Sequence, residues 1–208
     1  MNMQGIDMIF SIAILIMSVV IHEVSHGVVA NWLGDPTAKY AGRLTLNPIP
    51  HLDLFGSVLL PAFFILVDSP IFFAYAKPVP YNPYNLSNQR WGPAMVGVAG
   101  PISNILVAII FAIVLNFGVF SGEFLGIFIW IIQINIWLAL FNLIPIPPLD
   151  GSKLLFSVLP ARLLYWEQIL EQYGFFLLIA LLFILPDDVL LVPLSRLATI
   201  IVGLLIGV

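Results

Sequence analysis

The sequence contains no cysteine and very little charge. Without cysteine, the chain of 208 residues can form neither a disulfide nor a thiolate metal site, and it has no cysteine nucleophile. Charged residues make up 9% of the chain and hydrophobic residues 61%, whereas about 25% charge is usual in soluble domains. So little charge cannot cover a water-facing surface. We therefore expect an integral membrane protein, and the net charge of −4 gives no reason to expect nucleic acid as a partner.

Long apolar runs alternate with segments rich in proline and polar residues. Runs of about 20 residues are long enough to cross a bilayer as a helix. They predict an all-α polytopic membrane protein, a helical bundle in a single membrane-embedded domain over residues 1–208. The runs cover residues 7–33, 54–76, 93–120, 124–146, 165–185 and 189–207.

Two shorter segments depart from this pattern. The uninterrupted apolar part of the second run, Leu54 to Val67, is too short for a full crossing and is typical of a re-entrant segment. Residues 43–46 (Arg43, Leu44, Thr45 and Leu46) alternate in polarity, and Pro48 and Pro50 follow closely. The alternation predicts a small membrane-associated β-strand, and the prolines after it mark an edge or an end.

The stretch HEVSH, residues 22–26, places two of the three histidines inside the first apolar run. On a helix, residues four apart lie on one face with their Cβ atoms about 6 Å apart. Two imidazoles so placed can bind one metal ion, and Glu23 beside them can take a proton from water held at that site. A pair of core histidines with a chance glutamate is the alternative. We favour the metal site because an ionisable group at mid-membrane costs about 2.5–3.5 kcal/mol and is usually functional.

A catalytic zinc site usually has three protein ligands, so HEVSH alone is incomplete. Asp150 is the best third candidate, in the stretch NLIPIPPLDG of residues 142–151. Prolines unwind the helix there, and irregular backbone at membrane depth must be buried in protein or line a cavity. Asp150 could equally belong to an ordinary turn at a helix end. The incomplete histidine site makes us favour the ligand.

The combination of HEVSH and NLIPIPPLDG resembles the paired signature of the site-2 protease family of intramembrane zinc metalloproteases. The stretch AGPISN, residues 99–104, also resembles the start of that family's central helix. The resemblance covers residues 18 to about 155. The segments LTLNP and AKPVP make the chain similar to the compact type without PDZ or CBS domains.

This resemblance implies one zinc ion per chain, with His22, His26 and Asp150 as ligands. It also implies that Glu23 is the catalytic acid and base. Asn142 would donate a hydrogen bond to the substrate or to the developing oxyanion. The catalytic core would cover about residues 7–155, with additional transmembrane helices in residues 165–208.

The implied activity is cleavage of peptide bonds within or near transmembrane segments of membrane proteins, as in regulated intramembrane proteolysis. The partners would then be a transmembrane protein substrate and the lipid bilayer. The alternative is a membrane protein that binds or transports divalent metal without proteolysis. Transporters often contain paired broken helices in two similar halves, and the sequence has no such repeat.

Further residues are weaker candidates. His51 could be an accessory ligand, but we favour a loop histidine followed by Asp53 as the cap of the next segment. Asn104 could contact substrate or pack between helices, and the sequence leaves both open. The edge at residues 43–46 could hold an unwound substrate by β-strand addition.

The proposed metal site also restricts the topology. HEVSH lies towards the C-terminal end of the first run, and Asp150 follows residues 124–146, so both ends must face the same side of the membrane. An odd number of crossings must separate them, which makes the run 54–76 re-entrant and gives five full crossings. The positive-inside rule then predicts an outside N-terminus and an active site near the cytoplasmic face of the cell membrane. With this topology the loops on the active-site side contain the basic residues Lys39, Arg43, Lys77, Arg90, Lys153 and Arg162. The loops on the opposite side contain the acidic residues Glu123, Asp187 and Asp188.

Overall fold

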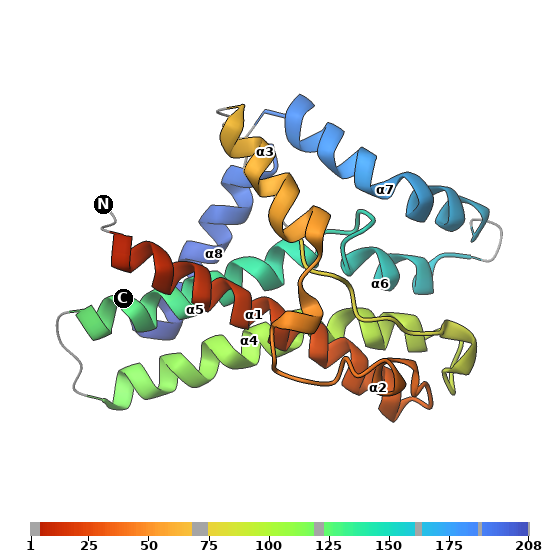
Figure 1. Ribbon diagram of the computed structural model, residues 1–208, viewed down its shortest axis with the longest axis horizontal. Helices are drawn as coiled ribbons and strands as arrows, with labels where there is room; N and C mark the ends of the chain where they lie inside the picture. Colours follow the sequence, from red (N-terminus) through yellow and green to blue (C-terminus); the bar gives the residue numbers. More distant parts are fainter. Residues whose placement is uncertain (1–4, 68–74, 119–122, 161–163, 187–188, 208) are drawn as a thin grey trace.

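The computed structural model describes residues 5–67, 75–118, 123–160, 164–186 and 189–207, and these residues are largely helical (Figure 1). The α-helices are α1 (Gly5–Trp32), α2 (Thr37–Tyr40), α3 (Leu60–Leu66), α4 (Gly92–Phe117), α5 (Glu123–Asn142), α6 (Gly151–Val158), α7 (Leu164–Ile184) and α8 (Leu191–Ile206). Short 3₁₀-helices cover Ile49–His51 and Pro83–Asn85, and a π-helix, η2, covers Leu54–Leu59. The prediction of an all-helical bundle is thereby confirmed.

Three helices are long and apolar enough to cross a membrane: Phe10–Trp32 in α1, Gly92–Phe117, which is α4, and Phe124–Asn142 in α5. The apolar parts of α7 and α8 are shorter, Ile169–Ile184 and Leu191–Ile206. The chain is therefore an integral membrane protein, and five full crossings stay a prediction. Arg162, Asp187 and Asp188, which entered the charge argument, lie outside the described residues.

Helices α1, α4 and α5 form the centre of the bundle, with α4 running opposite to the other two (Figure 1). Helix α8 packs against α4 and α5 through small and branched side chains. These are Ala108, Ala112, Ile132, Ile136, Ala198 and Val202. Alanines let helix backbones approach closely, which suits packing in lipid, where apolar burial alone does not drive association.

The ends of the central helices follow from proline and glycine. Helix α1 ends before Gly34, which has a φ of 105°, and Pro36 follows; a left-handed glycine commonly closes a helix. Helix α4 has Pro93 in its first turn, where a missing N–H costs nothing. Helix α5 stops at Asn142, ahead of the prolines of PIPP. Residues 143–150 therefore leave the helix and return towards α4.

The predicted β-strand at Arg43–Leu46 is wrong, since no strand occurs within the part of the chain that the structure describes. Local hydrogen bonds engage backbone groups that a strand would use. The N–H of Arg43 donates to the carbonyl of Ala38 at 2.9 Å, and the carbonyl of Thr45 accepts from Nε2 of His51 at 2.9 Å. No neighbouring strand is present among the described residues to pair with this segment, and the binding of an unwound substrate at residues 43–46 stays a prediction.

The run 54–76 returns to its starting point. Its described part continues from η2 into α3, and the N–H of Tyr75 then donates to the carbonyl of Gly56. Ser57 Oγ also donates to the carbonyl of Tyr75, and the N–H of Lys77 donates to the carbonyl of His51. Because its two ends lie side by side, this run enters and leaves the helical bundle at the same place.

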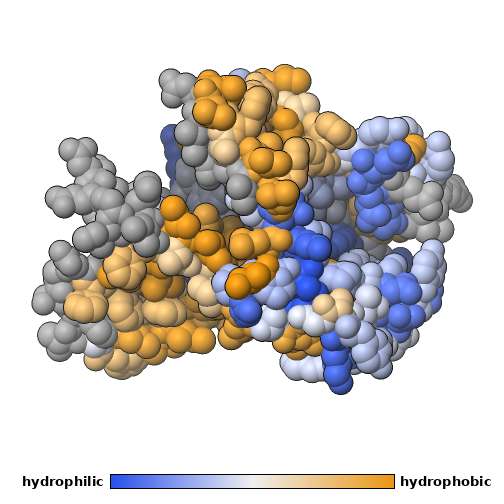
Figure 2. Space-filling view, viewed as in Figure 1, coloured by the Kyte–Doolittle hydropathy of each residue, from blue (hydrophilic) through white to orange (hydrophobic). Residues whose placement is uncertain are grey.

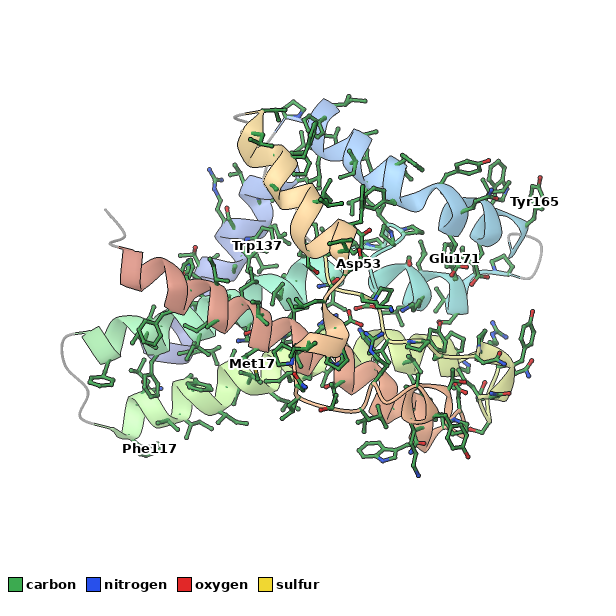
Figure 3. The ribbon with its side chains drawn as sticks, in the orientation of Figure 1. Met17, Asp53, Phe117, Trp137, Tyr165 and Glu171 are labelled. Atoms are coloured by element: carbon green, nitrogen blue, oxygen red, sulfur yellow. The ribbon has the colours of Figure 1, made fainter. Side chains whose placement is uncertain are left out.

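The surface of the molecule separates into an apolar part and a polar end. Figure 2 shows hydrophobic surface over the first half of α1, the last half of α4 and α3, and hydrophilic surface over α2 and the loops beside it. Phe117, at the apolar end of the bundle, is 88% exposed. Figure 3 labels Phe117 at that end, with Tyr165 at the opposite end, on α7. This distribution is that of a membrane protein whose described polar loops gather at one end of the bundle.

Candidate metal centre

Three side chains from different parts of the sequence converge inside the bundle. His22 and His26 lie on one face of α1, and Asp150 lies at the start of α6. The Nε2 atoms of His22 and His26 are 3.0 Å and 3.2 Å from the same Oδ2 of Asp150. All three residues are buried, with 5%, 7% and 6% of their surface exposed. The structure thus brings together the residues that the two motifs singled out.

The other nitrogen of each imidazole is bonded to a neighbouring helix. Nδ1 of His26 donates to the carbonyl of Val96 in α4, at 2.7 Å. Nδ1 of His22 donates to Oδ1 of Asn104, also in α4, at 2.6 Å. A proton on each Nδ1 leaves each neutral ring with a lone pair on Nε2. Such bonds fix the tautomer and orientation that metal-binding histidines need.

This donor set fits a divalent metal ion. Two Nε2 lone pairs and a carboxylate oxygen would repel one another unless positive charge lies between them. Two imidazoles and a carboxylate are ligands that zinc takes in catalytic sites. His22, Glu23 and His26 also offer ligand atoms within 4.8 Å of one another. The residues present therefore match the requirements of a zinc site.

Glu23 is held by the proline-rich segment on the polar side of the bundle. Its Oε2 accepts a hydrogen bond from the backbone N–H of Val79, at 2.9 Å. Val79 belongs to the stretch AKPVP and is buried. Because the donor is backbone, its presence could not be deduced from the side chains in the sequence.

Lys153, in the first turn of α6, binds the second oxygen of Asp150. Its Nζ is 3.2 Å from Oδ1 of Asp150 and lies over the ring of Tyr81, 5.4 Å from the centroid. The positive charge of Lys153 favours the ionised form of the Asp150 carboxyl. Asp150 is therefore a carboxylate with one oxygen facing the histidines. Sequence reasoning did not single out Lys153, although its place three residues after a candidate ligand was a signal.

Two glycines allow the close packing around this centre. A Cβ on Gly100 of α4 would lie 2.5 Å from Nε2 of His26 and 2.6 Å from Nε2 of His22. A Cβ on Gly151 would collide with the carbonyl of Leu143, so glycine lets the loop fold back behind Asp150. The motifs AGPISN and PLDG thus contribute space as well as side chains.

The remaining candidates lie outside the group formed by His22, His26 and Asp150. The amide nitrogen of Asn142 donates to the carbonyl of Leu138 on its own helix, at 2.9 Å. Asn104 is fully buried beneath His22. Leu44 packs towards Gly27 of α1, and Leu46 is 57% exposed.

His51 has both ring nitrogens engaged within the loop that follows α2. Nε2 donates to the carbonyl of Thr45 at 2.9 Å, and Nδ1 faces Nη2 of Arg43 at 3.4 Å. The same Nη2 donates to the carbonyl of Lys77, at 2.7 Å. Asp53 Oδ1 accepts from the N–H of Gly56 and so caps the next helical segment. These contacts are the loop and cap geometry that the sequence favoured for His51 and Asp53.

Comparisons with known proteins agree with this arrangement. The model of Peptidase family M50 matches residues 118–185, which include Asn142 and Asp150. A protein of Bacillus subtilis (strain 168), YwhC, named as a zinc metalloprotease, is 40% identical over 182 residues, which cover 83% of this chain and 78% of that protein.

Two further relatives carry the same kind of name. A zinc metalloprotease of Methanocaldococcus jannaschii, so named, is 28% identical over 153 residues, 70% of this chain and 72% of the relative. One of Mycolicibacterium smegmatis is 29% identical over 182 residues, 84% of this chain and 66% of the relative. No solved structure matches the chain. Relatives named as zinc metalloproteases therefore align along most of this chain. The chain belongs to peptidase family M50, the site-2 proteases, and is a zinc metalloprotease.

Proposed function

We propose that the protein is an intramembrane protease that hydrolyses peptide bonds within or near transmembrane segments of membrane proteins. The observation that supports it most is the location of the donor set. His22, Glu23 and His26 belong to the apolar helix Phe10–Trp32, which is long enough to span a bilayer. A metal centre on such a helix is reached at membrane depth, where a substrate would itself be a membrane segment.

In this proposal His22, His26 and Asp150 hold the zinc ion. When bound, zinc polarises a peptide carbonyl and lowers the pKa of water. The Val79 N–H holds Oε2 of Glu23, and the carboxylate takes a proton from the attacking water and passes it to the leaving amine. Lys153 keeps Oδ1 of Asp150 away from the histidines.

Asn142 is the proposed donor to the substrate carbonyl. One N–H of its amide is bonded to Leu138, and the second is the group that we assign to the oxyanion. The orientation of the site towards the cytoplasm, in the cell membrane, is part of the same proposal and rests on the distribution of Lys and Arg. The unit that acts is proposed to be the single domain of residues 1–208, with its core at about 7–155.

Replacement of Glu23 by glutamine tests the role of this residue. E23Q should retain one zinc per chain, because the proposed ligands are unchanged, while cleavage of a single-span membrane substrate falls about 100- to 10,000-fold. Zinc analysis and cleavage assays on the purified protein measure the two effects. E171Q, at an exposed position on α7, is the matched control and should retain both. Loss of zinc in E23Q would instead assign Glu23 to metal binding, as in the non-proteolytic alternative, and full cleavage by E23Q would refute the mechanism.

A further inference from the structure

A buried polar cluster lies behind His22, on the side of the ring that faces away from Asp150. It consists of Ser18 from α1, Asn104 from α4 and Asn135 from α5, which are 4%, 0% and 0% exposed. Each comes from an apolar helix of spanning length. Burying a polar group in such surroundings costs free energy unless the group is hydrogen-bonded, and polar groups buried there are usually functional. The proposed chemistry of Glu23 makes no direct use of this cluster.

The hydrogen bonds of the cluster run in one direction, from His22 into α5. His22 donates from Nδ1 to Oδ1 of Asn104. Asn104 donates from Nδ2 to Oδ1 of Asn135 at 2.7 Å and to the carbonyl of Ser18 at 3.2 Å. Asn135 donates from Nδ2 to Oγ of Ser18 and to the carbonyl of Ile131, both at 2.9 Å.

Backbone carbonyls set the direction of this chain of bonds. A carbonyl only accepts, so the amide nitrogen of Asn135 must face Ile131, and its oxygen must then face Asn104. Because the Asn135 oxygen can only accept, the amide nitrogen of Asn104 must donate to it. The oxygen of Asn104 then faces Nδ1 of His22. An oxygen at that place accepts only from a ring with its proton on Nδ1. The carbonyl of Ser18 likewise accepts from the nitrogen of Asn104, so Asn135 and Ser18 together decide which nitrogen of His22 carries the lone pair.

We propose that Asn135 is a positioning residue for the metal centre. Through Asn104 it holds His22 in the tautomer with the proton on Nδ1, and so keeps Nε2 available to zinc. If Asn104 turned over, its amide nitrogen would face Nδ1 and favour a proton on Nε2, which would block the ligand atom. This inference rests on the proposed role of His22 as a zinc ligand.

The test compares zinc affinity, by competition with a chelator, between the wild-type protein and N135A. Removal of the acceptor for Asn104 should weaken zinc binding about 10- to 100-fold, the usual cost of losing a group that orients a ligand. N116A is the matched control, because Asn116 of α4 also bonds a helix carbonyl, that of Leu205, far along the chain from the site. N116A should bind zinc as the wild type does, whereas unchanged affinity in N135A would overturn the proposal.

Nitrogen NMR of the zinc-loaded protein separates positioning from simple packing. A proton on Nδ1 of His22 is expected in the wild-type protein, and a proton on Nε2 would overturn the inference. In N135A this Nδ1 proton should exchange faster with solvent, and an unchanged exchange rate would also overturn it.

One further variant distinguishes this inference from the proposed function. H22A should lose zinc if His22 is a ligand. Retention of zinc by H22A would refute the ligand set itself. If H22A loses zinc and N135A does not, only the role of Asn135 fails.

Discussion

At the residue scale, the distance between α4 and the two histidines depends on one missing side chain. Gly100 is buried, and a methyl group at this position would lie within 2.6 Å of both Nε2 atoms. In a helix interior, alanine is otherwise favoured over glycine by about 0.5–1 kcal/mol. Alanine at position 100 should therefore favour the helix but disturb the metal centre, so helix content and zinc binding can be measured separately.

G100A is therefore expected to preserve the helix and to lose zinc. The methyl group would displace the ring nitrogens that converge on Asp150, and zinc affinity should fall about 100-fold or more, at the upper end for groups that orient ligands. Metal analysis and circular dichroism of the purified protein measure the two quantities. G126A in α5 serves as control because a Cβ there meets nothing within 4 Å. Full zinc content in G100A would show that the site is looser than the structure indicates.

At the scale of elements, the proline-rich segment of residues 76–86 is tied to the C-terminal half of α1 and to the turn that follows this helix. Val79 binds Glu23 within the helix. Beyond its C-terminal end, Asp35 is fully buried and accepts four hydrogen bonds: from the N–H and hydroxyl of Thr37, the N–H of Asn82 and the amide of Asn85. These contacts hold the segment over Glu23, so the position of this proposed catalytic carboxylate depends on a turn twelve residues away from it in sequence, at Asp35.

The Asp35 contacts predict a dependence of stability on pH. Burial raises the pKa of Asp35, but the hydrogen bonds from Thr37, Asn85 and Asn82 outweigh it, so the folded-state pKa lies below the usual value. A lowered pKa contributes stability that is complete above the unfolded-state pKa of about 3.9 and is lost as the pH falls below it. The wild-type protein should therefore unfold more readily below about pH 4.

D35N should be destabilised at neutral pH by about 1–3 kcal/mol, because its amide nitrogen would face donors that now bind a carboxylate. It should also lose that part of the acid sensitivity that Asp35 contributes. Thermal unfolding in detergent between pH 3 and pH 7 compares the two proteins. Equal slopes of stability against pH in both would exclude Asp35 as the source.

At the scale of the whole molecule, the polar end and the metal centre occupy the same side of the bundle. Helix α1 carries HEVSH towards the end at which α4 begins and α5 ends (Figure 1). Five of the six described basic residues belong to the loops and the short helices α2 and α6 at this end: Lys39, Arg43, Lys77, Arg90 and Lys153. The sixth, Arg196, lies in α8. The charge asymmetry predicts that this end faces the cytoplasm.

Single cysteines test that orientation without background, because the chain has none of its own. Y84C replaces a residue that is 80% exposed in the loop before α4, and G118C lies at the opposite end of α4. A membrane-impermeant maleimide added to intact cells should label G118C, and should label Y84C only after the membrane is opened. Labelling of Y84C in intact cells would reverse the proposed orientation.

The sequence by itself determined the membrane class, the helices and the histidine pair. These depend on composition and on local spacing: apolar runs give helices, and residues four apart on a helix share a face. It also indicated Asp150 and the returning run 54–76, because a site built from two motifs demands that their ends meet. The predicted strand at Arg43–Leu46 is wrong because alternating polarity does not supply a pairing partner. Backbone groups of Arg43 and Thr45 instead form local bonds with Ala38 and His51.

Only the tertiary structure decided what surrounds these residues. The Val79 N–H on Glu23 and the Val96 carbonyl on His26 are backbone groups, which every residue carries and no sequence pattern marks. Asn104 and Asn135 were visible as polar residues in apolar runs, yet their joint contact with Ser18 depends on how three helices pack. Spacing along one helix is fixed by backbone geometry, whereas the orientation of an imidazole is fixed by neighbours that only folding brings together.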